Sequence, residues 1–504
     1  MDYFLGFDIG TSGTKVLLIS AEGRIVNTVI SSYDIKSSHT DWAEQEPSTW
    51  WQALKKCINK LNNSFTPELK KVKAIGLSGQ MHGAVFMDKK GEPVYPCILW
   101  ADNRSEKECR EIKEKAGQEE IYQITGNPVI PAYTAPKILW FKKNKRKLYE
   151  KTDIILMAKD YIGFKLTGNY FTDYSDASGT LLFNIRKKRW SEKIFQELKL
   201  DINRHPEIIS SLSKAGNLTG KAAQELGLKQ GIPVIAGAGD LACGAIGSNN
   251  IKEGTATITI GTAGQVVASL NKVPETVTGE VFYFCHGLKN KYFSLASLLS
   301  GGLCLKWFKN NISKIENIIE KETGKDAFNI LINGIENISP GADGLFFLPY
   351  LNGAGTPYMD EKARGVFAGL TATHDKKDMV RSIIEGITFG IRQCLETLNK
   401  TGSDFNEINI GAGAAKNESW NRIQADIYNK PVSTLTITDT SALGAAILAA
   451  AGSGSFESVE EVCSFYVKKE QTIEPDPEQA GIYDELYEDY KQLYPAFKKV
   501  WGKD

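Results

Sequence analysis

The sequence is poor in the residue patterns that hold metals or disulfides. Its 504 residues include five His and eight Cys, and no two Cys are spaced as CxxC. Neither a structural zinc site nor a disulfide framework is therefore expected. This cysteine usage favours a reducing, cytoplasmic setting.

The sequence also lacks long apolar runs and an excess of either charge. No apolar run reaches the ~18 residues that span a bilayer. Asp8 interrupts the apolar N-terminal run, which argues against a signal peptide. Lys plus Arg and Asp plus Glu both number 60, so the formal net charge is zero. Neither a membrane nor a nucleic acid is expected as a partner.

A third absence concerns nucleotide-binding motifs. The chain has no GxxxxGK[ST], and no GxGxxG opens a helix after a strand, so P-loop and dinucleotide sites are not supported. Instead, Gly-rich turns follow apolar strands at 10–13, 261–264 and 411–413. Glycine lets the backbone approach a ligand and turn its N–H groups toward anionic oxygens. Each turn alone could be a plain hairpin turn, but three of them with acids nearby favour phosphate cradles.

The order of the predicted elements indicates an α/β protein of more than one domain. At about 150 residues per domain, the length suits three units or two large ones. Apolar strands such as 3–8 and 72–77 alternate with amphipathic helices. The segment 9–13 recurs as 260–264, about half the chain later, with Ala in place of one Ser. Such a repeated segment arises either from a duplicated domain or from a chance match in a Gly-rich turn.

Two acidic residues lie where predicted strands end. Asp8 ends the first strand, directly before the first Gly-rich turn, where it would either bind Mg²⁺ or cap the turn. Asp240 follows the apolar run 233–239, whose small residues leave room for a substrate. It would act either as a general base toward a hydroxyl or as the N-cap of a helix that starts at Leu241.

Two further segments suit a polyhydroxyl ligand. Gln80, Met81 and His82 follow a predicted strand, and α/β proteins bind ligands at such strand ends. His82 can donate a hydrogen bond to a sugar hydroxyl, or it can be structural. Trp100 and Asp102 lie in Trp-Ala-Asp-Asn-Arg, which would either face a sugar or form a core Trp beside a salt-bridged loop.

These motifs together resemble the FGGY family of carbohydrate kinases along nearly the whole chain, and its xylulokinase branch in particular. In chain order they are DIGTSGTKVLLI at 8–19, WAEQEPSTWW at 42–51, GQMHG at 79–83, TAPKILW at 134–140, KDY at 159–161 and TDYSDASGT at 172–180. GQMHG is the motif most typical of ketopentose kinases. The resemblance rests on the combination, so that no single motif has to carry it.

The resemblance implies an α/β fold with two actin-like ATPase (ribonuclease H-like) domains and a catalytic cleft between them. The N-terminal domain would span 1–247 and hold the sugar site and the first phosphate loop. The C-terminal domain would span 248–504 and hold the nucleotide site, with a helical tail from about residue 453. The tail would pack on the core or form a dimer contact, so a homodimer is one assembly that the sequence allows.

The resemblance also implies a set of site residues. Asp240 and Asp8 correspond to the catalytic base and the Mg²⁺-associated acid, and both are candidate metal ligands. The candidate sugar-binding residues are Gln80, Met81, His82, Trp100 and Asp102. The candidate nucleotide-binding residues are Thr11, Ser12, Lys15, Thr262, Gly302, Lys306, Gly413 and Asn417.

The implied reaction is the ATP-dependent, Mg²⁺-assisted phosphorylation of a ketopentose, D-xylulose to D-xylulose 5-phosphate. Two departures keep other substrates open. Ala354-Gly355 replaces the Glu-Arg pair of a GERTP motif that family members often have, and WADNR at 100–104 looks more like gluconate kinases than the WNDGR common in xylulokinases. The alternatives are a family kinase for L-xylulose, ribulose or gluconate, an actin-like ATPase without a sugar site, and a sugar-sensing regulator that has lost catalysis. Retention of Asp8 and Asp240 argues against the regulator.

Overall fold

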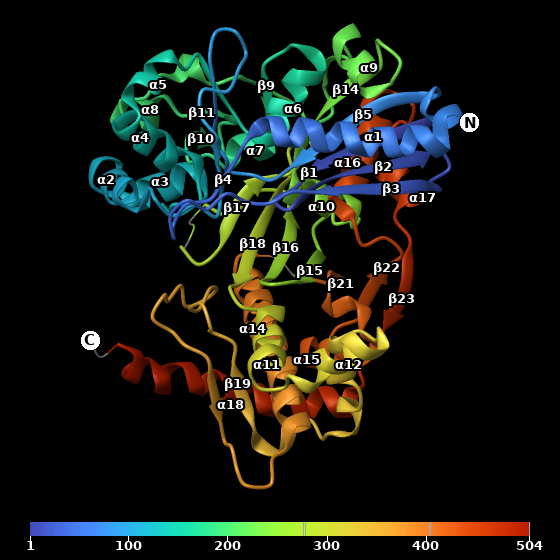
Figure 1. The fold of residues 1–504 in the computed structure, drawn as a ribbon. Coiled ribbons are helices and arrows are strands. Elements are labelled where there is room, and N and C mark those ends of the chain that lie inside the picture. The colour runs from blue at the N-terminus through green and yellow to red at the C-terminus, as the bar shows by residue number, and fades with distance from the viewer. Residues whose placement is uncertain (276, 278, 403–404, 503–504) are drawn as a thin grey trace. The chain divides into compact units, whose positions relative to one another are not determined.

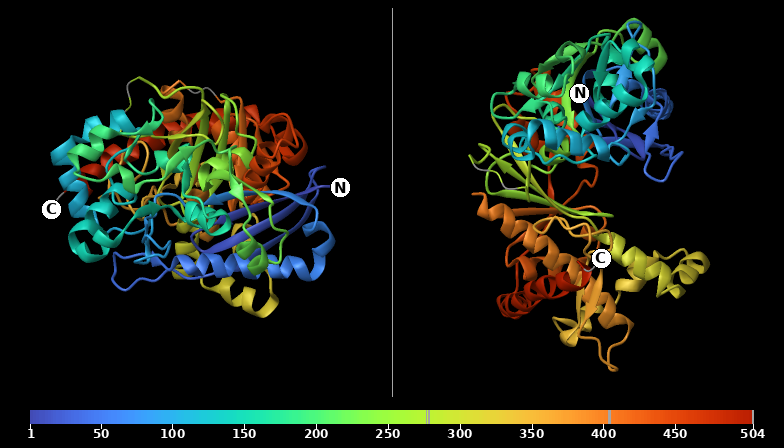
Figure 2. Two further views of the ribbon diagram at one scale, coloured as in Figure 1. Left: turned by 90° about the horizontal axis from the view of Figure 1, so that it is seen from above. Right: turned by 90° about the vertical axis from the view of Figure 1, so that its left-hand side faces the viewer.

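The chain forms two compact units, each built from segments that are far apart in the sequence (Figure 1, Figure 2). The computed structural model describes residues 1–275, 277, 279–402 and 405–502. The first unit comprises Met1–Ile251, Ser269–Phe293 and Asp439–Lys468, and the second comprises Lys252–Ala268, Ser294–Thr438 and Lys469–Asp504. The domain division at residues 247 and 248 stays a prediction.

The first unit contains a six-stranded sheet with parallel strands at its centre. In hydrogen-bonded order the strands are β13 (Lys214–Asn217), β14 (Pro233–Gly239), β5 (Val72–Gly79), β1 (Tyr3–Ile9), β2 (Gly13–Ser20) and β3 (Ile25–Ser32). β1 is parallel to β5, β5 is parallel to β14, and β1 is antiparallel to β2. The carboxyl ends of β14, β5 and β1 therefore lie side by side, where α/β proteins bind ligands.

The second large sheet repeats this strand order. Its strands are β17 (Phe282–Cys285), β18 (Tyr292–Leu298), β16 (Gly264–Leu270), β15 (Thr255–Ile260), β21 (Glu407–Gly411), β22 (Val432–Leu435) and β23 (Lys469–Ile473). β15 is antiparallel to β16 and parallel to β21, and β21 is parallel to β22. These pairings match those of β1, β2, β5 and β14. The repeated segments 9–13 and 260–264 thus form equivalent turns in the two sheets. This confirms the α/β class and the hypothesis of a duplicated domain.

The remaining elements flank the sheets or connect their strands. Helices of the first unit are α1 (Pro47–Leu69), α2 (Glu106–Ala116), α3 (Gln118–Thr125), α4 (Thr134–Asn144), α5 (Arg146–Lys151), α6 (Ala158–Thr167), α7 (Tyr174–Ser178), α8 (Glu192–Glu197), α9 (Gly220–Leu226), α10 (Asp240–Gly247), α16 (Thr440–Gly452) and α17 (Val459–Tyr466). Helices of the second unit are α11 (Gly302–Asn311), α12 (Ile315–Thr323), α13 (Ala327–Ile332), α14 (Lys376–Lys400), α15 (Glu418–Tyr428) and α18 (Pro477–Trp501). Shorter strands are β4 (Glu44–Gln45), β6 (Val85–Met87), β7 (Cys97–Ile98), β8 (Ile154–Leu156), β9 (Phe171–Asp173), β10 (Phe183–Asn184), β11 (Arg189–Trp190), β12 (Glu207–Ile209), β19 (Phe346–Leu348) and β20 (Val366–Ala368).

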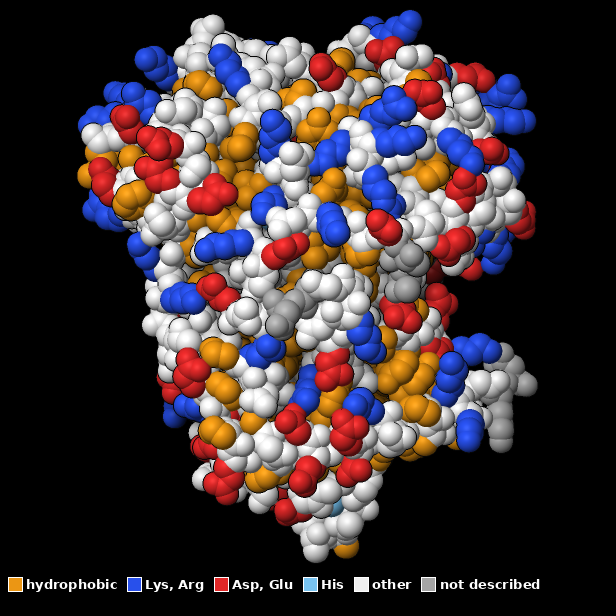
Figure 3. Space-filling view, turned by 180° about the vertical axis from the view of Figure 1, so that it is seen from behind, with side chains coloured by type: hydrophobic (Ala, Val, Ile, Leu, Met, Phe, Trp, Pro, Cys, Tyr) orange, Lys and Arg blue, Asp and Glu red, His pale blue; other side chains and the backbone are white. Residues whose placement is uncertain are grey.

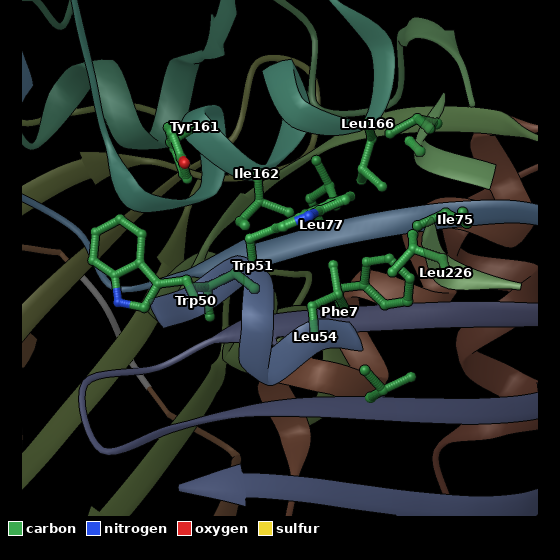
Figure 4. Close-up of a cluster of buried hydrophobic side chains, with 14 of the residues drawn as sticks. Phe7, Trp50, Trp51, Leu54, Ile75, Leu77, Tyr161, Ile162, Leu166 and Leu226 are labelled. Carbon is green, nitrogen blue, oxygen red and sulfur yellow. The ribbon is translucent and has the colours of Figure 1, made fainter. Parts of the chain in front are cut away.

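Alternate residues of the central strands in the first unit face two different helix layers. Every residue of β1 is buried, as expected for a strand that is covered on both faces. Phe7 and Leu77 belong to a hydrophobic cluster with Trp50 of α1 and Ile162 of α6 (Figure 4). α1 begins at Pro47, where the missing N–H removes no helical hydrogen bond. The opposite face of the same strands is left for α16.

α16 approaches that opposite face at two glycines. A Cβ on Gly6 would lie 2.1 Å from the carbonyl oxygen of Ala442, and a Cβ on Gly76 would lie 1.9 Å from that of Ala445. The strands need glycine at both positions so that the helix backbone can come this close. α16 comes late in the chain, yet it packs on the N-terminal strands (Figure 1).

The surface charge and the character of the helices both agree with the composition. One face of the molecule carries both acidic and basic side chains, in keeping with a formal net charge of zero (Figure 3). Among the residues that the structure describes, no helix is long and apolar enough to cross a membrane.

Candidate active site

The carboxyl ends of the parallel strands in the first unit bring together the two predicted strand-end acids. Asp8 lies in β1 opposite Ser78 of β5, and Ser78 lies opposite Ala238 of β14. The Ser78 hydroxyl donates a hydrogen bond of 3.0 Å to Asp8 Oδ1. Asp240 follows β14 as the first residue of α10. Both acids therefore lie at one edge of one sheet.

A bulge in β14 positions Asp240. The register of β14 against β5 shifts between Ile235 and Ala238. Gly237 has φ +71°, and a Cβ there would lie 1.8 Å from the Leu77 carbonyl oxygen, so only glycine fits. Bulges bend a strand and redirect the side chains that follow. α10 begins at Asp240 with Gly239 as its N-cap, so the alternative of a helix starting at Leu241 and capped by Asp240 is not what the structure shows.

Burial dominates the electrostatics of the two acids. It raises the pKa of Asp240 to about 7, the negative charge of Asp8 adds to this rise, and the N–H of Leu241 opposes it. Burial also raises the pKa of Asp8, while the Lys15 ammonium and the Ser78 hydroxyl act in the opposite direction. Asp240 is thus poised to gain or lose a proton near neutral pH, which suits a general base.

The start of α16 adds two residues to this edge that the sequence did not reveal, Asp439 before the helix and Ser441 in its first turn. Asp439, just before the helix, forms an ion pair with Lys15 of β2. The Ser441 hydroxyl donates 3.0 Å to the backbone oxygen of Asp240. Asp439 and Lys15 are 424 positions apart, so no local pattern links them. The only available signal was the polar Asp-Thr-Ser directly before the Ala-rich run.

A hydrogen-bond network joins the first Gly-rich turn to the GQMHG segment. The Thr11 hydroxyl donates to Gln80 Oε1 at 3.2 Å and accepts from Trp100 Nε1 at 3.0 Å. Gln45 donates to the Thr11 carbonyl at 2.7 Å and accepts from Gln80 Nε2 at 3.1 Å and from Trp50 Nε1 at 2.9 Å. The network gathers three predicted site residues around Gln45. Gln45 lies in the WAEQ motif but was not predicted as a site residue.

His82 is held in one tautomer beside this network. Its Nδ1 lies 2.7 Å from the Gly179 carbonyl oxygen, and because a carbonyl only accepts, Nδ1 carries the hydrogen. Burial lowers the pKa of His82 to about 4, so the ring is neutral at physiological pH. Nε2 is then an acceptor. The expectation that His82 donates to a sugar hydroxyl is therefore corrected, because its donor is already bound to Gly179. Met81 is buried beside it, with its side chain close to Gly179.

Asp102 is fully buried in an ion-pair cluster. Its Oδ2 accepts from Arg104 Nη2 and from the Ala43 N–H, both at 2.6 Å, and its Oδ1 accepts from Arg104 Nε at 2.8 Å. Arg104 also pairs with Glu44 at 2.7 Å and stacks over the Trp42 ring. In this structure the carboxylate orders the loop around WADNR. Its contact with a sugar stays a prediction, and Trp100, with 45% of its surface exposed, is the more accessible member of the segment.

A pocket of about 440 Å³ in the second unit gathers the predicted nucleotide residues of the C-terminal half. Its lining includes the predicted residues Thr262, Gly302, Lys306, Gly413 and Asn417. It also includes residues that the sequence did not indicate, among them Phe328, Asn329, Ile332 and Trp420. Thr11, Ser12 and Lys15 lie in the first unit. The predicted nucleotide residues are thus divided between the two units.

The described residues contain no group of three or more His, Cys, Asp or Glu that could hold a metal ion. This rules against a dedicated metal cage in that part of the chain. It is compatible with Mg²⁺, which is usually held by one or two carboxylates together with phosphate oxygens and water. Asp8 and Asp240 are the carboxylates at the sheet edge that fit this pattern.

Comparison with known proteins identifies the class and the family. The repeated sheet and its Gly-rich turns define an α/β protein of the actin-like ATPase fold. Residues 3–247 match the N-terminal domain, and residues 250–453 the C-terminal domain, of the FGGY family of carbohydrate kinases. The chain belongs to this family and is a carbohydrate kinase, a phosphotransferase, which confirms the resemblance seen in the sequence.

Individual relatives resemble the chain over nearly its full length. The xylulose kinase of Staphylococcus xylosus is 35% identical over 98% of this chain and 100% of its own. The gluconokinase of Bacillus subtilis is 30% identical over 91% of this chain and 89% of its own. The solved structure of a ligand-bound xylulose kinase from Lactobacillus acidophilus is 26% identical and covers 100% and 99% of the two chains, with a TM-score of 0.91.

Proposed function

We propose that this chain transfers the γ-phosphoryl group of ATP to the 5-hydroxyl of D-xylulose, giving D-xylulose 5-phosphate and ADP. The proposal is carried by the buried Asp8 and the partly buried Asp240, which lie at neighbouring strand ends of a carbohydrate kinase whose relatives include xylulose kinases. A cytoplasmic setting and a homodimer stay predictions.

Asp240 acts as the general base. Its carboxylate accepts the proton of the 5-hydroxyl as that oxygen attacks the γ-phosphorus, and the bond from phosphorus to the β–γ bridging oxygen breaks to release ADP. A pKa near 7 gives the carboxylate enough basicity while leaving it largely ionised at slightly alkaline pH. Little covalent chemistry falls to the protein in such a transfer, so positioning and charge compensation contribute most.

Lys15, Thr11 and Ser12 bind phosphate oxygens on the side of the first unit. Mg²⁺, when bound, neutralises charge that develops on the transferred phosphoryl group. Asp8 would hold it, directly or through water, with Asp240 beside it. In the second unit, Thr262, Gly302, Lys306, Gly413 and Asn417 would hold the rest of the nucleotide.

The geometry of the GQMHG segment supports the proposed sugar contacts. His82 Nε2 accepts a hydrogen bond from a sugar hydroxyl, because Nδ1–H is bound to Gly179. Gln80 and Met81 belong to the same GQMHG segment as His82. The exposed ring of Trp100 offers a flat face to the sugar. Asp102 is the remaining predicted contact.

Gluconate is the second candidate substrate. The WADNR segment and the similarity to a gluconokinase both favour gluconate over L-xylulose and ribulose as the alternative to D-xylulose. L-xylulose and ribulose remain further members of the test panel.

The test is ADP release with Mg-ATP and D-xylulose, L-xylulose, D-ribulose, D-fructose, glycerol, gluconate or no sugar. We expect kcat/KM for D-xylulose to exceed the others by at least about tenfold, equivalent to ~1.4 kcal/mol of transition-state preference. Preference for gluconate would replace the substrate but keep the reaction. Turnover that is independent of sugar would overturn the proposed reaction.

A further inference from the structure

The TDYSDASGT motif supplies a buried carboxylate that the proposed mechanism does not use. Asp173 ends β9, directly before α7, and is fully buried. Its Oδ2 accepts from the Ser175 hydroxyl at 2.6 Å, the Ser211 hydroxyl at 2.8 Å and the Ser175 N–H at 2.9 Å. Its Oδ1 lies 3.3 Å from Lys159 Nζ. A carboxylate with this many donors is held firmly in one position.

Both serines that Asp173 holds are bonded to the bulged end of β14. The Ser175 hydroxyl accepts the Gly239 N–H at 2.9 Å, and the Ser211 carbonyl accepts the Gly237 N–H at 3.0 Å. A hydroxyl has one hydrogen, and at Ser175 it is directed to Asp173, which leaves a lone pair for Gly239. The two bonded glycines flank Ala238, and Gly239 directly precedes Asp240.

The bulge explains why β14 depends on these serines. The register shift between Ile235 and Ala238 interrupts the regular ladder with β5 at this point. A buried backbone N–H that finds no partner costs about 1–3 kcal/mol. Ser175 and Ser211 supply acceptors at Gly239 and Gly237, so the conformation of the segment that aims Asp240 depends on Asp173.

The charges around Asp173 are compensated locally. Lys159 Nζ lies 2.6 Å from Asp160 Oδ1, 3.3 Å from Asp176 Oδ2 and 3.3 Å from Asp173 Oδ1, and all of these side chains are buried. Burial raises the pKa of Asp176 well above its ordinary value and also raises that of Asp160. The serine hydroxyls and the Ser175 N–H converge on Asp173, whereas Asp176 pairs with the Lys159 ammonium.

We propose that Asp173 is a positioning residue for phosphoryl transfer: through the hydroxyl of Ser175 and the backbone and hydroxyl of Ser211, it fixes the bulge that aims Asp240. The inference deepens the proposed function and rests on the role of Asp240 as the base. Its effect is on the placement of the base, so it acts on kcat and leaves ATP binding in place.

Ser175→Ala tests this with the loss of one hydroxyl. We expect kcat to fall at least about tenfold, with KM for ATP changed by less than about twofold. The control is Ser178→Ala, on the same helix and equally buried, whose hydroxyl bonds the Ser175 carbonyl and the Cys285 N–H rather than β14. We expect near-normal kcat for the control, and recovery of most activity in Ser175→Thr. Ser211→Ala, also expected to lower kcat, provides an independent variant if Ser175→Ala does not fold.

A double-mutant cycle separates positioning of Asp240 from a general structural role. In an Asp240→Asn background, Ser175→Ala should lower kcat no further, because the group that it positions is gone. Multiplicative losses, or equal kcat for Ser175→Ala and Ser178→Ala, would overturn the inference while leaving Asp240 as the base. Normal kcat in Asp240→Asn alone would instead overturn the proposed base.

Discussion

At the scale of single residues, the surroundings of Asp8 and Asp240 assign them different roles. Asp8 lies beside the Lys15 ammonium and accepts the Ser78 hydroxyl, and both favour its charged form. Asp240 instead faces the negative charge of Asp8, which adds to the effect of burial and favours its protonated form. Burial raises the pKa of both carboxyls, but the neighbouring Lys15 ammonium opposes this rise at Asp8, whereas the charge of Asp8 adds to it at Asp240, which suits Asp240 as the proton acceptor.

Replacing Asp240 with Asn removes the proton acceptor and preserves its size. General-base catalysis contributes about 10²–10⁴-fold, so we predict that Asp240→Asn lowers kcat by at least ~100-fold. The affinity for nucleotide should change less, since the predicted nucleotide residues of the second unit are untouched. Steady-state kinetics and ADP titration measure the two effects. Near-normal kcat would remove Asp240 from this role.

The pKa of Asp240 predicts the pH dependence of the reaction. Only the deprotonated carboxylate accepts a proton, and burial raises its pKa to about 7. kcat/KM should therefore be constant above pH ~7 and fall about tenfold for each pH unit below it. A pH–rate profile on the wild-type enzyme measures this limb, and the residual activity of Asp240→Asn should lack it. A wild-type profile that stays flat down to pH 5 would contradict the assignment.

At the scale of elements, the contact between α16 and the central strands leaves no space for a side chain. We predict that Gly76→Ala destabilises the protein by about 1–3 kcal/mol or more, because its Cβ would lie 1.9 Å from the Ala445 carbonyl oxygen and the helix must shift. Denaturant unfolding measures the change. The control is Gly481→Ala in α18, where a Cβ meets nothing within 4 Å and alanine favours the helix. Equal stability of the two variants would disprove the close packing.

The elements also show what the sequence could and could not predict. Thr262 and Gly413 line one pocket because they lie in Gly-rich turns that follow strands, positions that local patterns indicate, whereas Gly302 in the same lining was implied only by the family resemblance. Asp439 could not be found in this way, because its proximity to Lys15 depends on where α16 packs. Asp102 shows a second limit, since the sequence left open whether it faces a sugar or belongs to a salt-bridged loop, and the structure shows it buried and paired with Arg104.

At the scale of the whole molecule, the first unit depends on a segment from near the end of the chain. Asp439–Lys468 contributes α16 and α17 to it. A fragment of residues 1–251 would therefore lack the helix that covers Gly6 and Gly76 on the central strands. We predict that this fragment shows no cooperative thermal unfolding and binds a hydrophobic dye, in contrast to the full-length chain. Cooperative unfolding at the full-length temperature would contradict this.

The late position of α16 also delays the completion of the first unit during synthesis on the ribosome. The N-terminal strands are complete by Gly239, but their covering helix begins only at Thr440. At about 5–20 residues per second, the ribosome needs on the order of ten to forty seconds to bridge this interval. Throughout it, the nascent sheet presents an uncovered apolar face to the cell. We therefore expect the growing chain to need protection from aggregation until α16 has been synthesised.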